Sequence, residues 1–285
     1  MKKLLCLLAA IALVPALTGC SLFSKPAHTT VATNGLVVHY LDVGQGDSEI
    51  LQCGTQTMLI DAGTNETTNT LIRDIKGLGI TRFDVVVATH PHEDHIGGMD
   101  AVINQFDIGT VYMPDVTANT VTFSDVLKAI SNKNLKPVHP TPGMVFNLGN
   151  AQCTVLAPNS ATYQDMNNYS IVIKVVFGSN SFLFTGDAQT QSEQEMLARG
   201  YNLQADVLKV GHHGSDTATS PAFLAAVKPK YAVIEVGAGN DYGHPHAVTL
   251  QKLAAAGVTV YRTDLNGNVT ITSDGSNISI SAAKP

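Results

Sequence analysis

The chain has 285 residues, which is enough for one large domain or two small ones with a buried core. Hydrophobic residues make up 44% and charged residues 14% of the sequence, a composition that excludes a disordered protein. The formal net charge is −6 and no basic run is present, which excludes an extended electrostatic track for a long polyanion. A phosphate-bearing substrate would therefore have to be held mainly by metal.

The first residues have the features of a targeting segment. Two lysines precede an apolar run over 4–17, which is too short to be a convincing membrane span. The run ends in LTGC at 17–20, which resembles a bacterial lipobox, where the chain is cut before a cysteine that then carries lipid. We expect residues 1–19 to be a signal peptide and Cys20 to anchor the protein by its acyl chains, on the extracytoplasmic side of the cell envelope. The alternative is an ordinary signal peptide that happens to contain a cysteine.

The remainder of the chain shows a short polar segment and then continuous patterning. Residues 20–35 lack periodicity and are predicted to be a tether, and residues 36–285 are predicted to form one domain. Residues 1–19 contain two of the 17 basic residues and none of the 23 acidic ones, so their removal leaves a charge of −8.

Strand and helix patterns follow one another without a linker. In the first half, strands are predicted at 36–42, 48–53, 56–60, 83–88 and near 109–113, and helices at 67–78, 97–106 and 120–132. In the second half, strands are predicted at 151–156, 169–177, 181–185, 206–210, 231–236 and 258–261, helices at 189–199, 220–227 and 247–256, and a hairpin at 268–273 and 277–281. The order is β-rich then βα, twice, and two such halves packed sheet on sheet give a four-layer αββα sandwich of the α/β class.

The strongest chemical signal follows the apolar strand at 83–88. The segment THPHEDHIGG at 89–98 contains His90, His92, Asp94 and His95 within six residues, directly before a predicted helix. His90 and His92 can converge on one metal ion, and Asp94 and His95 can turn toward a second. Imidazole and carboxylate are the ligands that zinc prefers where thiolate is absent. The alternative is a polar turn that happens to be rich in histidine.

This HxHxDH pattern resembles the first metal motif of the metallo-β-lactamase-fold hydrolases. The segments LDVGQGDS at 41–48, LIDAG at 59–63, NNYS at 167–170, FLFTGD at 182–187, LKVGHHGS at 208–215, YGHPH at 242–246 and RTD at 262–264 follow in order. Together they resemble the soluble hydrolase domain of the ComEC competence proteins over residues 36–282. The resemblance implies the sandwich fold and a dinuclear centre. The full competence proteins also carry a membrane channel, of which this sequence shows no sign, so we do not expect a role in DNA uptake to carry over.

The resemblance assigns further ligands beyond the first motif. Asp187 ends an apolar strand at a glycine and is expected to bridge both metals, with a helix N-cap as the alternative. One of His212 and His213 is expected to complete the second metal site, and alternation does not decide which. Many members of the fold place a histidine where this chain has Asn168, with Ser170 nearby. An amide oxygen is a weaker ligand, so the first metal is expected to be bound less tightly.

Other residues are assigned supporting roles. Asp61 is expected to orient a ligand histidine, or else to serve only the turn before Gly63. Asp47 lies in a GQGD turn that its own turn chemistry can explain. His246, at the start of the helix at 247–256, is expected to bind substrate or to donate a proton to the leaving group, and His244 in the same loop is the second candidate.

The remaining histidines, cysteines and cations are assigned no chemistry. His39 and His139 are predicted to be structural. Cys53 and Cys153 either pair in an oxidising compartment or are small buried residues. The charges expected to be ordinary and mostly solvated are Lys209, Lys228 and Arg262.

The expected activity follows from a dinuclear centre. Two zinc ions, or manganese in their place, would generate a bridging hydroxide that attacks a phosphodiester, with Asp94 and His246 nearest to the chemistry. The alternatives are a lactam or thioester hydrolase and a non-catalytic metal-binding surface lipoprotein. We expect contact with the membrane only through the lipid anchor, and no protein partner.

Overall fold

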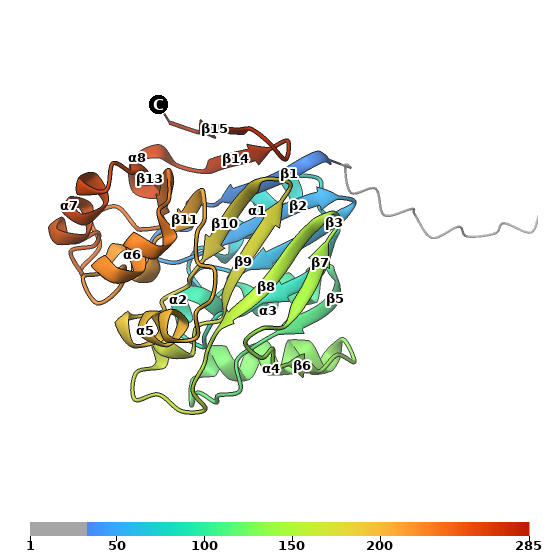
Figure 1. Ribbon diagram of the computed structural model, residues 1–285. Helices are drawn as coiled ribbons and strands as arrows, with labels where there is room; N and C mark the ends of the chain where they lie inside the picture. Colours follow the sequence, from blue (N-terminus) through green and yellow to red (C-terminus); the bar gives the residue numbers. More distant parts are fainter. Residues whose placement is uncertain (1–32, 285) are drawn as a thin grey trace, which may run out of the picture.

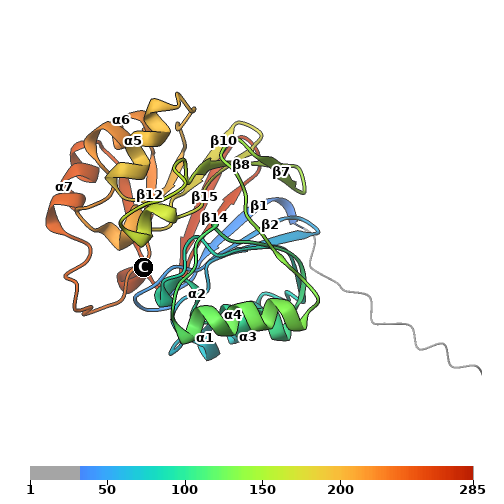
Figure 2. The same ribbon diagram turned by 90° about the horizontal axis from the view of Figure 1, so that it is seen from below.

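A computed structural model describes residues 33–284, so residues 1–32, with the predicted signal peptide and Cys20, lie outside the described part. Two β-sheets face each other, with helices on both outer surfaces (Figure 1). Viewed from below, α1, α3 and α4 cover one side and α5, α6 and α7 the other (Figure 2). The predicted four-layer αββα sandwich is therefore confirmed.

The first sheet contains the early strands and the C-terminal hairpin. Its order is β15 (Ile278–Ala282), β14 (Val269–Ser273), β1 (Thr33–Tyr40), β2 (Glu49–Gly54), β3 (Gln56–Ile60), β4 (Arg82–Val87), β5 (Asp107–Tyr112) and β6 (Pro137–Val138). β1, β2 and β3 pair antiparallel, with the loop over 41–48 between β1 and β2, whereas helical crossovers make β3 to β5 parallel.

The second sheet contains the strands from the middle of the chain onward. Its order is β13 (Thr259–Arg262), β12 (Tyr231–Ile234), β11 (Val207–Lys209), β10 (Asn180–Phe184), β9 (Val172–Phe177), β8 (Ala151–Ala157) and β7 (Val145–Leu148). The strands from β10 to β13 are parallel. In both sheets the parallel strands therefore deliver the residues that follow them to one edge.

The helices divide between the two outer layers. The first sheet has α1 (Thr68–Gly77), α2 (Glu93–Ile96), α3 (Met99–Gln105) and α4 (Val121–Asn132), and the second has α5 (Thr190–Ala198), α6 (Pro221–Val227) and α7 (Ala247–Ala255). A short α8 (Thr263–Asn266) follows β13, and two 3₁₀ turns, η1 (Met166–Tyr169) and η2 (Gly211–Gly214), precede β9 and follow β11.

The core has three layers because the strands are apolar on both faces. In β2, Ile50 packs beneath the helices of the first sheet, whereas Leu51 and Cys53 face the opposite sheet. Cys53 and Cys153 both lie in this inter-sheet core as free, buried thiols, and burial together with the nearby Cys53 raises the pKa of Cys153 to about 12. Of the two possibilities in the sequence, the structure has the buried thiols.

Several boundaries differ from the sequence prediction. The helix predicted at 97–106 is α3, which spans Met99–Gln105, and a separate short α2 that was not predicted begins inside the histidine motif at Glu93. The strand predicted at 169–177 begins at Val172, because η1 occupies the residues before it. β1 begins at Thr33, inside the segment predicted as a tether. The patterns did not predict β6, β7 or α8. Among the helices of residues 33–284, none is long and apolar enough to cross a membrane.

Candidate metal centre

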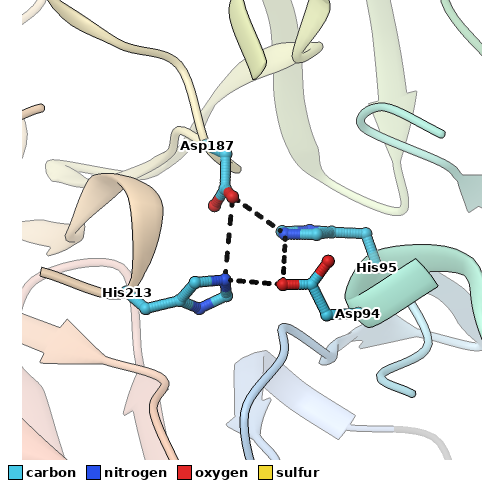
Figure 3. Close-up of side chains that lie close together, drawn as sticks. All are labelled: Asp94, His95, Asp187 and His213. Atoms are coloured by element: carbon cyan, nitrogen blue, oxygen red, sulfur yellow. Dashed lines mark hydrogen bonds and ion pairs between the residues drawn. The ribbon is translucent and has the colours of Figure 1, made fainter. Parts of the chain in front are cut away.

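Four side chains from three loops converge where the parallel strands end. Asp94 and His95 lie on α2, Asp187 follows β10, and His213 lies on η2 after β11 (Figure 3). His213 Nε2 lies 3.2 Å from Asp94 Oδ2 and 3.6 Å from Asp187 Oδ2, and His95 Nε2 lies 3.3 Å from Asp187 Oδ2. We call these four residues the His95 group. Their ligand atoms lie within 4.8 Å of one another, a spacing that could hold one metal ion.

A second set of side chains lies on the other side of Asp187. His90 Nε2 is 3.9 Å from Asp187 Oδ2 and 3.0 Å from His92 Nδ1, and His212 Nε2 is 3.8 Å from the same carboxylate oxygen. We call His90, His92 and His212, with the shared Asp187, the His90 group. His90 is buried, whereas the His212 side chain is 21% exposed and borders the pocket.

Asp61 occupies the position predicted for an orienting carboxylate. It follows β3, and its Oδ2 accepts a hydrogen bond from His95 Nδ1 at 2.7 Å, which turns His95 Nε2 toward Asp187. Thr89 donates to the same carboxylate from its backbone N at 2.8 Å and from its hydroxyl at 2.6 Å. Ser170 plays a similar part, because its hydroxyl lies 3.3 Å from His90 Nδ1 and accepts from the Asp187 backbone N at 3.1 Å.

Asp47 contacts the site more closely than turn chemistry requires. It is fully buried, and its Oδ1 lies 3.2 Å from His213 Nδ1. The turn that carries it packs directly under α2, since a Cβ on Gly46 would lie 2.4 Å from the Asp94 carbonyl oxygen. Lys209 was predicted to be solvated and this is wrong: it is 0% exposed, and its Nζ forms an ion pair with Asp47 Oδ2 at 2.5 Å.

The electrostatics of the His95 group favour a cation. Burial acts to lower the pKa of His213, but the carboxylates of Asp187 and Asp47 outweigh burial and raise it to about 10. Burial likewise opposes the charged form of Asp47, yet Lys209 and His213 lower its pKa to about 2. His213 Nδ1 already donates to the Glu235 carbonyl at 3.0 Å, so a neutral ring presents a lone pair at Nε2 to two carboxylates. That arrangement is repulsive unless a positive charge lies between them.

Unsatisfied atoms at the same place support this reading. His95 Nε2 and Asp187 Oδ1 are buried and have no hydrogen-bond partner within residues 33–284. A buried polar atom without a partner costs roughly 1–3 kcal/mol. His95 Nε2 lies 3.3 Å from Asp187 Oδ2 and 3.9 Å from Asp94 Oδ2, with room for an ion among them, so the residues present fit a metal.

Three non-glycine residues of the site have left-handed backbone conformations. Their φ values are 55° at Asp61, 51° at His212 and 52° at His213. Such conformations are uncommon for residues with a Cβ and cost of order 1–3 kcal/mol each. At η2 they allow two successive histidines to point to the same side of the second sheet, which an extended strand would not permit. Both histidines therefore reach Asp187.

The structure brings Asn167, and not the predicted Asn168, to the site. Asn168 Oδ1 accepts from the backbone N atoms of Gln189 and Ser192 at 3.2 and 3.3 Å, so it stabilises the start of α5. Asn167 lines the pocket; its Nδ2 donates to His212 Nε2 at 3.3 Å, and its Oδ1 is buried without a partner among the described residues. Both asparagines lie in η1, and this turn directs their side chains to different surroundings.

Of the two histidines before α7, the structure places His244 in the pocket instead of the predicted His246. His246 Nδ1 accepts from the Asp216 backbone N at 3.0 Å, and His246 is not among the residues that line the pocket. His244 does line it, with ring centroids 5.5 Å from His212 and 6.2 Å from His213. Burial, followed by the charges of His213 and His212, lowers the pKa of His244 to about 4. His246 therefore lies behind His244, with ring centroids 4.9 Å apart, and His244 is the histidine of this pair that lines the pocket.

The pocket above the two groups has a volume of about 490 Å³. Its walls are formed by Gln45, Thr64, His92, Glu93, Asp94, Asn167, Asp187, His212, His213, Tyr242 and His244. No lysine or arginine from the described part of the chain lines it. Tyr242 is 67% exposed and stacks on His244, with ring centroids 5.6 Å apart and an interplanar angle of 21°. His39 and His139 lie elsewhere and bond to Thr270 and to the Met113 carbonyl.

Comparison with known proteins agrees with this geometry. The family model of the metallo-β-lactamase superfamily matches residues 41–237, and the chain belongs to this superfamily. The chain is 31% identical over 250 residues to ComE operon protein 3 of Bacillus subtilis, covering 81% of this chain and 32% of that protein. It is 32% identical over 239 residues to competence protein ComA of Neisseria gonorrhoeae, covering 83% and 32%. The chain thus spans about a third of the length of these relatives.

Solved structures share the fold at low sequence identity. CmlA, a diiron β-hydroxylase from Streptomyces venezuelae, superposes with a TM-score of 0.57 at 15% identity, covering 84% of this chain and 54% of that one. The metallo-β-lactamase fold protein YhfI from Bacillus subtilis superposes with a TM-score of 0.53 at 13% identity, covering 80% and 96%. At these identities the likeness concerns the fold alone.

Proposed function

We propose that this protein is a dinuclear metal-dependent phosphodiesterase. The observation that supports it best is the surroundings of Asp187 Oδ2. Ring nitrogens of four histidines lie around this one oxygen, at 3.9 Å for His90, 3.3 Å for His95, 3.8 Å for His212 and 3.6 Å for His213. A carboxylate between two sets of imidazoles is suited to bridge two ions.

The two groups divide the ligands between two ions. Asp94, His95 and His213 would hold one, His90 and His92 the other, and Asp187 both. His212 and the neutral amide of Asn167 border the pocket on the His90 side, so that side is the more open to substrate. Two divalent cations, zinc or manganese, would supply a water of lowered pKa and neutralise charge that develops on the attacked group.

The protein residues around the ions have distinct tasks. Asp61 and Ser170 fix the rings of His95 and His90. With its pKa held near 4, His244 is a neutral imidazole at pH 7, which suits it to hydrogen-bond the substrate and makes it a poor source of a proton. Tyr242 offers an exposed ring beside His244, on which an aromatic or base substituent of the substrate can stack.

Two features favour a short phosphodiester over long duplex DNA. The described residues place no basic side chain in the pocket, and the charge of the whole chain is −6, so few cations are available for phosphates beyond the metals. The phosphodiester class itself is proposed from the resemblance to the competence-type hydrolase domains. Anchoring through Cys20 is a further proposal from the sequence, and it would place the enzyme at the cell envelope.

The test combines metal content with substrate preference. Protein purified without chelator should contain two equivalents of transition metal by elemental analysis. It should then hydrolyse bis-nitrophenyl phosphate faster than a chromogenic cephalosporin, and lose that activity on chelation. Trace metal only would defeat the dinuclear centre, and faster cleavage of the cephalosporin would defeat the substrate class.

A further inference from the structure

The buried lysine beneath the metal centre has no part in the proposed chemistry. Lys209 is the last residue of β11, and its ammonium lies in the interior at 0% exposure. A lysine is almost never fully buried unless it is paired, because removing its charge from water is costly. Its Nζ contacts Asp47 Oδ2 at 2.5 Å and donates to the Val210 carbonyl at 3.1 Å.

Asp47 links this lysine to two histidines of the His95 group. Its Oδ1 lies 3.2 Å from His213 Nδ1 and its Oδ2 lies 3.8 Å from His95 Nδ1. Both contacts are made by the ring nitrogens that face away from Asp187. The other nitrogen of each ring, Nε2, faces Asp187 Oδ2 at 3.6 and 3.3 Å. His213 Nδ1 also donates to the Glu235 carbonyl at 3.0 Å and His95 Nδ1 to Asp61 Oδ2 at 2.7 Å, so Asp47 adds a second, charged contact on the distal side of each ring.

Further contacts fix the turn that carries Asp47. Its backbone N donates to the Asp94 carbonyl at 3.2 Å, and its own carbonyl accepts from Gly63 N at 2.9 Å. The next residue, Ser48, donates from its backbone N to Glu235 Oε1 at 3.0 Å. The carboxylate itself projects toward Lys209, the one cation that contacts it among the described lysines and arginines.

We propose that Lys209 is a positioning residue, which acts through Asp47 on His213 and His95 and so sets the affinity of the His95 group for its metal. A ligand histidine is held by a partner on its distal nitrogen, and loss of such a partner typically weakens metal affinity ~10–100-fold. Lys209 contacts Asp47 and not the ligand rings themselves, and through Asp47 it acts on both His213 and His95. The His90 group makes no contact with Asp47 in the described structure, so its affinity should not depend on Lys209.

The experiment measures cobalt binding at each group separately. The change His90→Ala leaves the His95 group as the intact site, and His213→Ala leaves the His90 group. In the first background, Lys209→Met should weaken cobalt binding ~10–100-fold and alter the visible absorption of the bound ion, because the charged contact of Asp47 with both ligand rings is no longer fixed. In the second background the same substitution should leave cobalt affinity unchanged.

A matched control separates positioning from a general loss of stability. Lys174 is another buried lysine of the second sheet, whose amine donates to the Asn202 carbonyl at 2.9 Å and contacts neither group. Lys174→Met should leave cobalt affinity unchanged in both backgrounds, whatever it does to thermal stability.

A double substitution keeps the test valid if the Lys209→Met variant does not fold. Lys209→Met leaves Asp47 as an uncompensated buried charge, so Asp47→Asn is added to remove it. The double variant should fold and still bind cobalt weakly at the His95 group. Equal weakening at both groups, or unchanged affinity at the His95 group, would overturn the inference.

The inference rests on the proposed metal centre and not on the substrate. A wild-type protein that binds two cobalt ions and cleaves no phosphodiester would defeat the proposed function, while the cobalt affinities of the variants would still decide the role of Lys209.

Discussion

Asp187 and Asp61 are both buried carboxylates in contact with His95, yet their removal should have very different effects. Asp187 Oδ2 lies within 3.9 Å of ring nitrogens from four histidines, so Asp187→Asn weakens both metal groups together. Asp61 contacts His95 from the side away from Asp187, at 2.7 Å, so Asp61→Asn loosens one ring of one group. In both variants the side chain keeps its size and loses its charge.

The magnitudes follow from these contacts. Metal ions contribute several kcal/mol of charge stabilisation in the transition state. At about 1.4 kcal/mol per factor of ten, their loss in Asp187→Asn corresponds to a decrease of kcat/KM of roughly 1000-fold or more. An orienting partner is typically worth ~10–100-fold in metal affinity or activity, which is the range expected for Asp61→Asn.

The assay is hydrolysis of bis-nitrophenyl phosphate at saturating metal, with metal content measured on the same samples. Asp187→Asn should retain less than two equivalents of metal, whereas Asp61→Asn should recover part of its activity as metal concentration rises. Ser160→Ala, away from both groups, is the folding control. Equal losses in the two variants would show that the bridging role given to Asp187 is wrong.

Four further predictions concern the site and its surroundings. Asn168→Ala should cost ~1 kcal/mol of unfolding free energy, as loss of a helix cap does, and keep activity. Asn167→Ala should keep stability and lose activity. Denaturant unfolding and turnover are measured on both variants, and loss of activity in Asn168→Ala with none in Asn167→Ala would contradict the assignment. Tyr242→Ala should raise the KM of a nucleotide diester roughly 5- to 150-fold, since base stacking on an aromatic ring is worth about 1–3 kcal/mol, and Tyr242→Phe should not; an unchanged KM in Tyr242→Ala excludes stacking. Hydrolysis of short DNA should depend only modestly on salt, and a steep log–log slope would indicate phosphate contacts outside the pocket. Cys20→Ser should release the protein from the membrane fraction or leave it uncleaved, and wild-type fractionation and processing would exclude the lipid anchor.

The sequence was sufficient for the fold and for most of the ligand types. Apolar runs before HPHEDH and TGD indicated buried strands that end at one edge, because local hydrophobic patterning reflects burial directly. The sequence left Asp61 either to orient a histidine or to serve its turn, and the structure has it hydrogen-bonded to His95. The order of β-rich and βα segments predicted the sandwich. These features depend on residues near one another in the chain.

Only the tertiary structure decided which of two similar neighbours faces the site. Asn167 replaces Asn168 because a 3₁₀ turn rotates the segment, and His212 and His213 both reach Asp187 because their backbone is left-handed. No periodicity encodes such conformations, since they are stabilised by contacts from distant strands.

Lys209 is the clearest case of this kind. In the sequence it is one more charged residue at the end of a strand, and a lone lysine is usually solvated. Its partner, Asp47, is 162 residues away in the chain and lies in the loop between β1 and β2 of the other sheet. The burial of this ion pair depends on how the two halves of the molecule pack. The sequence by itself therefore determined the layers and the types of ligand. The packing of those layers determined which side chains lie behind the ligands.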